Sequence, residues 1–246
     1  MADPYDYVSP NIEQVDPSSA FPNRAVGAPR WAVFGNGRER NDPHRWYYDD
    51  RWPPDGFVNC DEAHLLTANA RLVAGNNALE IGCLSGYSAW HLLSGGVNLT
   101  ICDPALTEPT RRSAVRDSLR QLLNWRLLAI PSPAGAIELG EQYGPWSLVF
   151  IDGCHYDPYP MLDAIAAQHF CAPDAMILFH DSLYAGVRSA ISLLKSAGWR
   201  ARAYYTSQML AVCWRGNIEP AAHIPDPAIV NAELDPEYPQ DLLRWD

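Results

Sequence analysis

Hydrophobic residues follow two alternating patterns through the middle of the chain. Short runs of Ile, Leu, Val and Phe, typical of buried strands, alternate with stretches in which apolar residues recur every three or four positions, typical of amphipathic helices. The predicted strands cover residues 78–82, 98–103, 125–132, 146–153 and 175–181. The predicted helices cover residues 61–75, 88–96, 110–123, 135–144, 160–170 and 187–199. This alternation predicts an α/β fold, doubly wound around a mainly parallel sheet.

The pattern changes at both ends of this region. Residues 200–216 read as two consecutive strands joined around Thr206 and Ser207, which predicts an antiparallel hairpin at one edge of the sheet. Residues 1–55 and 217–246 are rich in proline and lack a sustained period. We therefore expect an N-terminal aromatic and proline-rich arm (1–55), a ligand-binding domain (56–216) and an acidic, proline-rich C-terminal tail (217–246).

The arm carries more large aromatic side chains than a solvated leader needs. They are Trp31, Phe34, Trp46, Tyr47, Tyr48 and Trp52. We expect the arm to pack on the domain, to cover a substrate pocket or to contact a second copy of the chain in a homodimer.

Composition narrows the classes of partner. The net charge of −11 over 246 residues, without a dense Lys/Arg stripe, argues against nucleic acid. No apolar run approaches the ~20 residues that span a bilayer, and the N-terminus does not resemble a signal peptide, so we expect no membrane association and a cytoplasmic location. The six cysteines are scattered singly, and Cys154 alone lies in a loop beside candidate functional groups.

Residues that follow the predicted strands are the ones to examine, because ligands of open parallel sheets bind outside the strands' carboxyl ends. After the first strand, Gly82 and Gly86 allow a sharp turn and close approach to a ligand, and Ser85 offers a hydrogen bond. Their G-x-x-x-G spacing, preceded by the acidic Glu80, differs from the dinucleotide and P-loop patterns. Asp103, 23 residues after Glu80, is placed to accept both hydroxyls of a ribose, so the turn and the acid together predict a nucleoside-containing cofactor.

The fourth and fifth strands deliver a second group of polar side chains to the same edge. Asp152 and His155 follow one strand, and His180 and Asp181 end the other. A histidine near neutral pKa is suited to remove the proton of a hydroxyl. Alternatively, Asp152 and Asp181 could bind Mg²⁺, which lowers the pKa of a hydroxyl bound to it.

These motifs together resemble class I S-adenosylmethionine-dependent methyltransferases. The runs LEIGCLSGYS and ICD are similar to their motif I and ribose-binding acid. The runs FIDGCHYDPY and FHDS resemble a subgroup of small-molecule O-methyltransferases with D-G-x-H-x-Y and H-D motifs, several of which act in natural-product pathways. The sequence departs from that subgroup in having Ala172-Pro173-Asp174-Ala175 where Pro-Gly-Gly is usual.

The resemblance implies a Rossmann-like fold and a role for each motif residue. The implied cofactor-binding residues are Glu80, Gly82, Ser85, Gly86, Asp103, Ser132 and Asp152. The implied catalytic residues are His155, His180 and Asp181, with Asp152 and Asp181 as alternative metal ligands. The implied activity is transfer of a methyl group from S-adenosylmethionine to an oxygen of a small molecule or tailored peptide. Two alternatives stay open, an NAD-dependent oxidoreductase and a non-catalytic binding protein that retains the fold.

Overall fold

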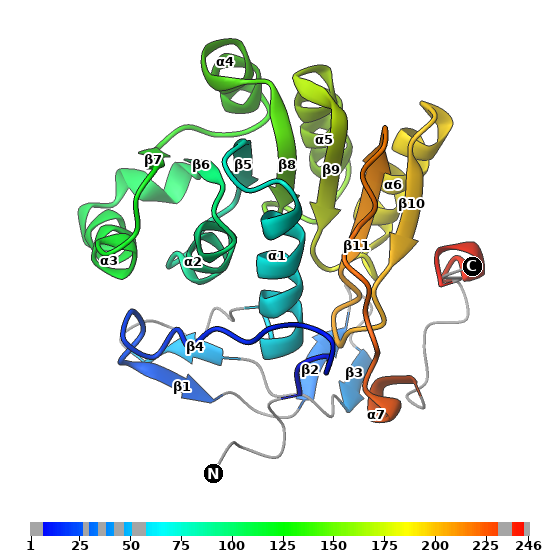
Figure 1. The fold of residues 1–246 in the computed structure, drawn as a ribbon, viewed down its shortest axis with the longest axis horizontal. Coiled ribbons are helices and arrows are strands. Elements are labelled where there is room, and N and C mark those ends of the chain that lie inside the picture. The colour runs from blue at the N-terminus through cyan, green and yellow to red at the C-terminus, as the bar shows by residue number, and fades with distance from the viewer. Residues whose placement is uncertain are drawn as a thin grey trace.

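The central sheet holds most of the described chain together. The structure, a computed structural model, describes residues 7–26, 30–33, 38–41, 47–50, 58–230 and 238–243. Within them, seven strands form one sheet in the order β10-β11-β9-β8-β5-β6-β7 (Figure 1). Their bounds are β5 (Asn77–Ile81), β6 (Asn98–Cys102), β7 (Trp125–Leu128), β8 (Trp146–Ile151), β9 (Cys171–Phe179), β10 (Arg200–Ala203) and β11 (Ala211–Arg215).

The strand directions follow from what connects them. Strands β7, β6, β5, β8 and β9 run parallel, since each connection includes a helix that returns the chain to the start of the next strand. Strand β11 pairs antiparallel with both β9 and β10. The predicted mainly parallel sheet with an antiparallel hairpin at one edge is confirmed.

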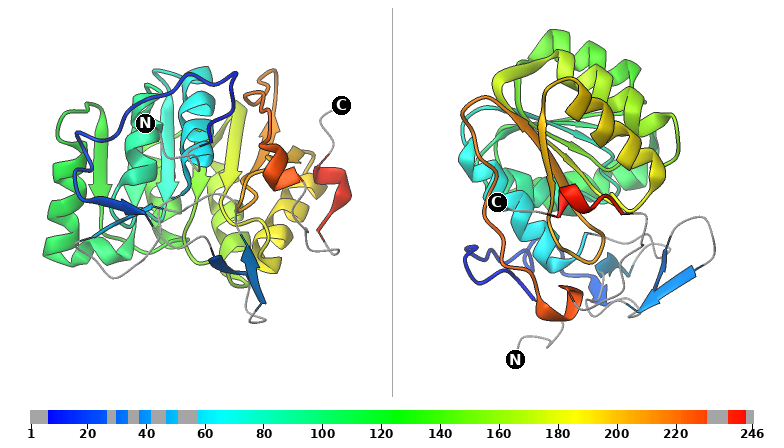
Figure 2. Two further views of the ribbon diagram at one scale, coloured as in Figure 1. Left: turned by 90° about the horizontal axis from the view of Figure 1, so that it is seen from below. Right: turned by 90° about the vertical axis from the view of Figure 1, so that its right-hand side faces the viewer.

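Helices cover both faces of the sheet (Figures 1 and 2). Helices α1 (Cys60–Leu72), α2 (Tyr87–Ser94) and α3 (Pro109–Leu119) pack on one face. Helices α4 (Ala134–Tyr143), α5 (Tyr159–His169) and α6 (Ala185–Ser196) pack on the other. All six residues of β8 are buried, which explains why this strand reads as a continuous apolar run.

Some element ends differ from the prediction. Strand β7 ends at Leu128 rather than at residue 132, because the prolines at 131 and 133 lack the N–H that a strand ladder uses. Strand β9 begins four residues early, at Cys171, which pairs with Trp146 ahead of a register irregularity. The 172–175 segment that departs from the family pattern therefore lies inside a strand.

The described parts of the arm and tail pack on the outside of the domain: the strands at 30–33 and 38–41 lie beyond the carboxyl ends of the parallel strands, and the last described tail segment lies beside β10 (Figures 1 and 2). Strands β1 (Arg24–Val26) and β4 (Tyr47–Asp49) pair antiparallel, as do β2 (Arg30–Val33) and β3 (Arg38–Asn41). The tail contributes the short helix α7 (Pro227–Val230) and the 3-10 helix η2 (Gln240–Leu242). Phe34, Trp46, Trp52, the side chain of Trp31 and the predicted boundary at residue 55 lie outside the described residues.

Asp61 of α1 joins the arm to the tail. Its Oδ1 accepts a hydrogen bond from the Ser9 backbone N–H at 2.9 Å, and its Oδ2 lies 2.8 Å from Nε2 of His223. Beside this pair, the Tyr7 hydroxyl donates to the Ile224 carbonyl at 2.6 Å. The arm and tail thus lie side by side across the same helix. Among the described residues, none of the helices has both the length and the apolar character needed to cross a bilayer.

Candidate active site

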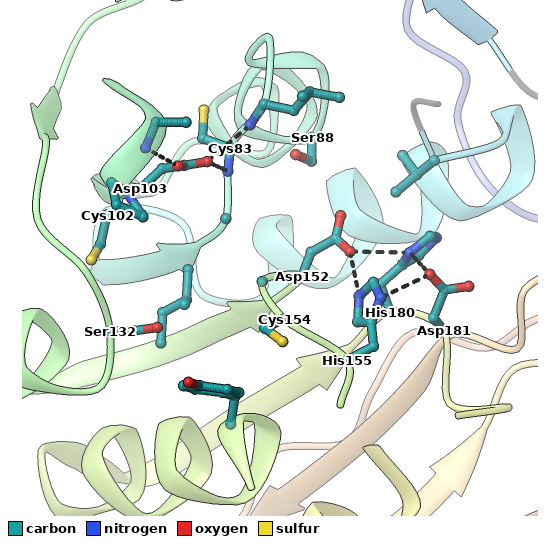
Figure 3. A pocket seen from close by; sticks show the side chains of 18 of the residues that line it. Cys83, Ser88, Cys102, Asp103, Ser132, Asp152, Cys154, His155, His180 and Asp181 are labelled. Carbon is teal, nitrogen blue, oxygen red and sulfur yellow. Dashed lines mark hydrogen bonds and ion pairs between the residues drawn. The ribbon is translucent and has the colours of Figure 1, made fainter. Parts of the chain in front are cut away.

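A cavity of about 680 Å³ lies at the carboxyl ends of the parallel strands (Figure 3). Residues that follow five different strands line it, as expected for an open parallel sheet. The lining includes Gly82, Asp103, Ser132, Asp152, His155, His180 and Asp181. The size suits a nucleoside-sized ligand together with part of a second molecule.

The turn after β5 depends on Gly82. This residue has φ +89°, and a Cβ atom there would lie 2.3 Å from the backbone oxygen of Asp152. Only glycine fits both the left-handed backbone and this close approach. Gly86, with φ +85°, is the N-cap of α2 and packs against Val115.

Asp103 fixes the shape of the glycine turn. Its Oδ2 accepts hydrogen bonds from the backbone N–H groups of Cys83 at 2.9 Å and Leu84 at 3.3 Å. Its Oδ1 accepts from the Ala105 N–H at 2.7 Å and caps the 3-10 helix η1 (Pro104–Thr107). Asp103 therefore both anchors the turn and borders the cavity, and its Oδ1 keeps one lone pair that can accept a ligand hydroxyl.

Glu80 lies one layer behind the cavity wall. Its side chain is fully buried and accepts a hydrogen bond from the Ser88 hydroxyl, while its Oε2 has no hydrogen-bond partner among the described residues. Burial raises the pKa of Glu80 to about 8, and the negative charges of Asp152 and Asp103 add to that rise. In the free protein at neutral pH, Glu80 is therefore mainly a neutral acid rather than the carboxylate that its sequence suggests.

Four side chains from two neighbouring strand ends converge at the other end of the cavity (Figure 3). Oδ1 of Asp152 lies 3.2 Å from Nε2 of His155 and 3.2 Å from Nδ1 of His180. Oδ2 of Asp181 lies 3.3 Å from Nδ1 of His180 and 3.5 Å from Nδ1 of His155. We call Asp152, His155, His180 and Asp181 the His–Asp cluster.

Positive and negative charges stabilise each other within the His–Asp cluster. Burial disfavours the charge on Asp152, but the two imidazoles outweigh burial and hold its pKa below the usual range. Burial would lower the pKa of His180, yet Asp152 and Asp181 raise it well above its usual value. The pKa of His155 is also raised, by Asp152 and Asp181 against the effect of burial. The two carboxylates thus favour the charged form of both imidazoles in the free protein.

Glu62 is a functional candidate that the sequence reasoning missed. This fully buried carboxylate comes from the first turn of α1, and its Oε2 lies 3.3 Å from Nε2 of His180. Its Oε1 accepts a hydrogen bond from the backbone N–H of Gln208 at 3.0 Å. Burial raises the pKa of Glu62, but the contact with His180 outweighs burial and lowers it. Glu62 also completes the capping box with Asn59, which is the only role that a first-turn acid reveals in sequence.

The structure brings most of the predicted site residues to one cavity. Seven line it, whereas Glu80, Ser85 and Gly86 do not: Glu80 is buried behind the glycine turn, and Ser85 is 7% exposed. Other lining residues come from segments that the sequence reasoning did not connect with the site, among them Val58, Arg111, Tyr184 and Gln208.

The donor atoms of the His–Asp cluster are compatible with a divalent cation. One ligand atom from each of the four residues lies within 4.8 Å of the other three. Two carboxylates are ligands that Mg²⁺ accepts, and two imidazoles extend the fit to Mn²⁺ or Zn²⁺. Cys154, exposed in the loop beside the cluster, and the other five cysteines, all in the described part of the chain, are free thiols.

Comparison with known proteins agrees with this architecture. Residues 79–182, less than half of the chain, match the family model described as a methyltransferase domain. No curated protein sequence is significantly similar to the chain.

Solved structures show the same fold at low sequence identity. An O-methyltransferase from Bacillus cereus in complex with SAH is 16% identical, with a TM-score of 0.53 over 66% of this chain and 84% of that one. A putative O-methyltransferase from Klebsiella pneumoniae is 19% identical, with a TM-score of 0.55 over 66% and 83%. The O-methyltransferase TomG from Streptomyces achromogenes, involved in tomaymycin synthesis and solved with SAM, is 18% identical, with a TM-score of 0.51 over 66% and 83%. The fold is therefore the Rossmann-like methyltransferase fold, and together with the family match it supports a class I S-adenosylmethionine-dependent methyltransferase.

Proposed function

We propose that this protein transfers the methyl group of S-adenosylmethionine to a hydroxyl or carboxyl oxygen of a small molecule or tailored peptide. The observation that carries the proposal is the single cavity that joins the Asp103 turn to the His–Asp cluster. A methyl donor whose ribose is held at Asp103 would place its sulfonium between the two. An acceptor oxygen at the cluster would then lie in line for direct displacement.

The charges of the cavity support a cationic donor. Within the described residues the cavity walls carry Asp103, Asp152 and Asp181 together with Arg111 and the two imidazoles of the His–Asp cluster. Asp103 faces backbone N–H groups rather than an imidazole, so its negative charge is the one available to stabilise a bound sulfonium. The alternative of an NAD pyrophosphate fits poorly, because the same carboxylates would repel its phosphates.

The preference for an oxygen atom as the methyl acceptor depends on how the acceptor loses its proton. In a displacement at a methyl carbon, the sulfur–carbon bond breaks as the oxygen–carbon bond forms, and the acceptor proton passes to a base. An imidazole flanked by carboxylates is such a base only after it has released its own proton, which the raised pKa values of His155 and His180 oppose at neutral pH. We therefore favour a site in which a cation takes the place of that positive charge.

Asp152 and Asp181 would hold this cation, with His155 and His180 as further ligands or as hydrogen-bonding groups for the acceptor. When bound, a divalent cation lowers the pKa of a coordinated hydroxyl and orients it. The protein's part is to fix the donor atoms: Asp152 follows β8 with its N–H bonded to the Ile81 carbonyl, and Glu62 holds the far nitrogen of His180.

Calorimetric titration with S-adenosylmethionine and, separately, with NAD tests the cofactor. We expect micromolar binding of the sulfonium ligand and none of NAD. Failure of S-adenosylmethionine to bind would overturn the proposal.

Transfer of a labelled methyl group from S-adenosylmethionine to a panel of phenols, polyols, carboxylic acids and hydroxylated peptides then identifies the acceptor class. Adding EDTA to the active reaction tests the cation. Undiminished turnover after EDTA would assign proton removal to the histidines alone, and cofactor binding without transfer to any acceptor would favour a binding protein.

A further inference from the structure

Asp163 is a buried carboxylate that the proposed reaction does not use. It lies on α5 and is 1% exposed, and neither of its oxygens has a hydrogen-bond partner within the described part of the chain. Leaving such a group unpaired in the interior destabilises a protein, so an orphaned carboxylate calls for an explanation.

The neighbours of Asp163 place it directly behind one end of the cavity. A Cβ atom on Gly153 would lie 3.8 Å from Oδ2 of Asp163. Burial raises the pKa of Cys102 to about 12, and the charge of Asp163 adds to that rise. Burial raises the pKa of Asp163 itself to about 6, and the hydroxyl of Ser132 partly offsets the rise. Gly153, Cys102 and Ser132 all line the cavity.

Ser132 and Cys102 lie on the same side of the cavity as Asp103, across from the His–Asp cluster (Figure 3). If the ribose is held at Asp103 and the methyl group faces the cluster, as the proposed function requires, the nucleobase lies beside Ser132. Adenine presents an exocyclic amine, which is a hydrogen-bond donor. A hydroxyl whose own hydrogen is directed to a carboxylate behind it is left with only acceptor lone pairs facing the ligand.

We propose that Asp163 orients the Ser132 hydroxyl so that its oxygen accepts a hydrogen bond from the adenine amine, which makes the pair a selector for amino-purine over oxo-purine nucleosides. Asp163 acts through Ser132 and is a positioning residue. The inference rests on the proposed function, because it needs the nucleoside to bind in this orientation. It also accounts for the unpaired carboxylate, whose partner hydroxyl is fixed when the ligand binds.

The test compares two ligands that differ at the amine alone, S-adenosylhomocysteine and S-inosylhomocysteine. In the wild-type protein we expect calorimetry to show a preference for the adenosyl ligand of roughly tenfold or more. In Asp163→Leu, a variant with the same branching at Cγ but without polar atoms, and in Ser132→Ala, we expect that preference to fall below about threefold, with the loss on the adenosyl side. Asp163→Asn keeps an acceptor oxygen for the Ser132 hydroxyl and should restore most of the preference.

The outcomes separate this inference from the proposed function. Equal weakening of both ligands in Asp163→Leu and Ser132→Ala, with the preference unchanged, would give Asp163 a purely structural role and overturn the inference alone. Failure of both ligands to bind the wild-type protein would overturn the proposed function as well. Asp157→Asn, which changes an exposed carboxylate in the loop before the same helix, is the matched control and should leave both affinities unchanged. Should Asp163→Leu not fold, Ser132→Ala at the half-buried loop position decides the matter.

Discussion

Carboxylates near the cavity fall into two groups that differ in what faces them. Asp152 and Asp181 face two imidazoles, and the pKa of Asp152 is lowered. Glu80 and Asp163 are almost fully buried and have no cationic partner within the described residues, and burial raises their pKa values to about 8 and about 6. The first group has imidazole partners before any ligand arrives, whereas burial of the second group without such partners destabilises the free protein.

This difference indicates which part of the site is preorganised and which part depends on the ligand. The His–Asp cluster balances its own charges and can hold its geometry without a ligand. Glu80 and Asp163 lie behind the part of the cavity assigned to the cofactor, where a sulfonium, an amine and a nucleobase would supply positive charge and hydrogen-bond donors. The destabilisation that the unpaired carboxylates cause in the free protein would thus be offset when the cofactor binds.

The largest expected effect follows from removing the His180 imidazole, the partner of Asp152 and Asp181. His180→Ala leaves Asp152, Asp181 and Glu62 facing each other without the imidazole between them. We expect methyl transfer to the acceptor found by screening to fall by about 100-fold or more, with affinity for S-adenosylhomocysteine changed little. His169→Ala, at an exposed position on α5, is the control. Turnover that survives the loss of His180 would remove the His–Asp cluster from the reaction.

The strand ends could be predicted from the sequence, but the residues that lie behind the cavity wall could not. The strands, the topology of the edge hairpin and the positions of Asp103, Asp152, His155 and Asp181 were predictable, because a parallel sheet brings all its carboxyl ends to one edge. Whether a residue faces the cavity or lies behind it depends on the local turn. Gly82 faces the cavity, whereas Ser85 and Gly86, a few positions later, do not.

Residues distant in sequence could not be placed for a different reason. Glu62 looks like an ordinary first-turn acid, and its contact with His180 spans 118 positions of the chain. Asp163 looks like a polar residue on an amphipathic helix, and its burial follows from the packing of α5 against β8 and β9. In both residues, the chemistry comes from a partner or a cavity that only the tertiary structure supplies.

The second prediction tests how far the unpaired carboxylate of Glu80 destabilises the free protein. Because the folded-state pKa of Glu80 is raised from 4.5 to about 8, its contribution to stability is present below pH 4.5 and is lost as pH rises to 8. Glu80→Gln removes the ionisable group and should raise the free energy of unfolding of the ligand-free protein on the order of 3 kcal/mol at pH 8.5, but little at pH 4.5. Urea denaturation across this range measures it. Glu138→Gln, at an exposed position of α4, should show no such pH dependence.

A smaller effect is expected at Asp103, whose carboxylate is paired with backbone N–H groups rather than with an imidazole. If its remaining lone pair holds a ribose hydroxyl, Asp103→Ala should weaken S-adenosylhomocysteine binding by about tenfold, since an acceptor and the shape of the glycine turn are lost together. Asp117→Ala, at an exposed position of α3, is the control for charge. Unchanged affinity in Asp103→Ala would reduce Asp103 to a helix cap and leave the ribose without its assigned partner.

The smallest expected effect concerns the Ser88 hydroxyl, the one hydrogen bond that Glu80 receives in the described structure. A hydroxyl donor stabilises the carboxylate more than the neutral acid, so Ser88→Ala should lower the free energy of unfolding by about 1 kcal/mol at pH 9 and by less at pH 6. Ser94→Ala on the same helix removes a hydroxyl bonded only to the Trp90 carbonyl and should be insensitive to pH. Equal losses at both pH values for Ser88→Ala would show that Glu80 does not ionise in the folded protein over this range. Glu80 would then stay protonated over this whole pH range, in contrast to the paired carboxylate of Asp152.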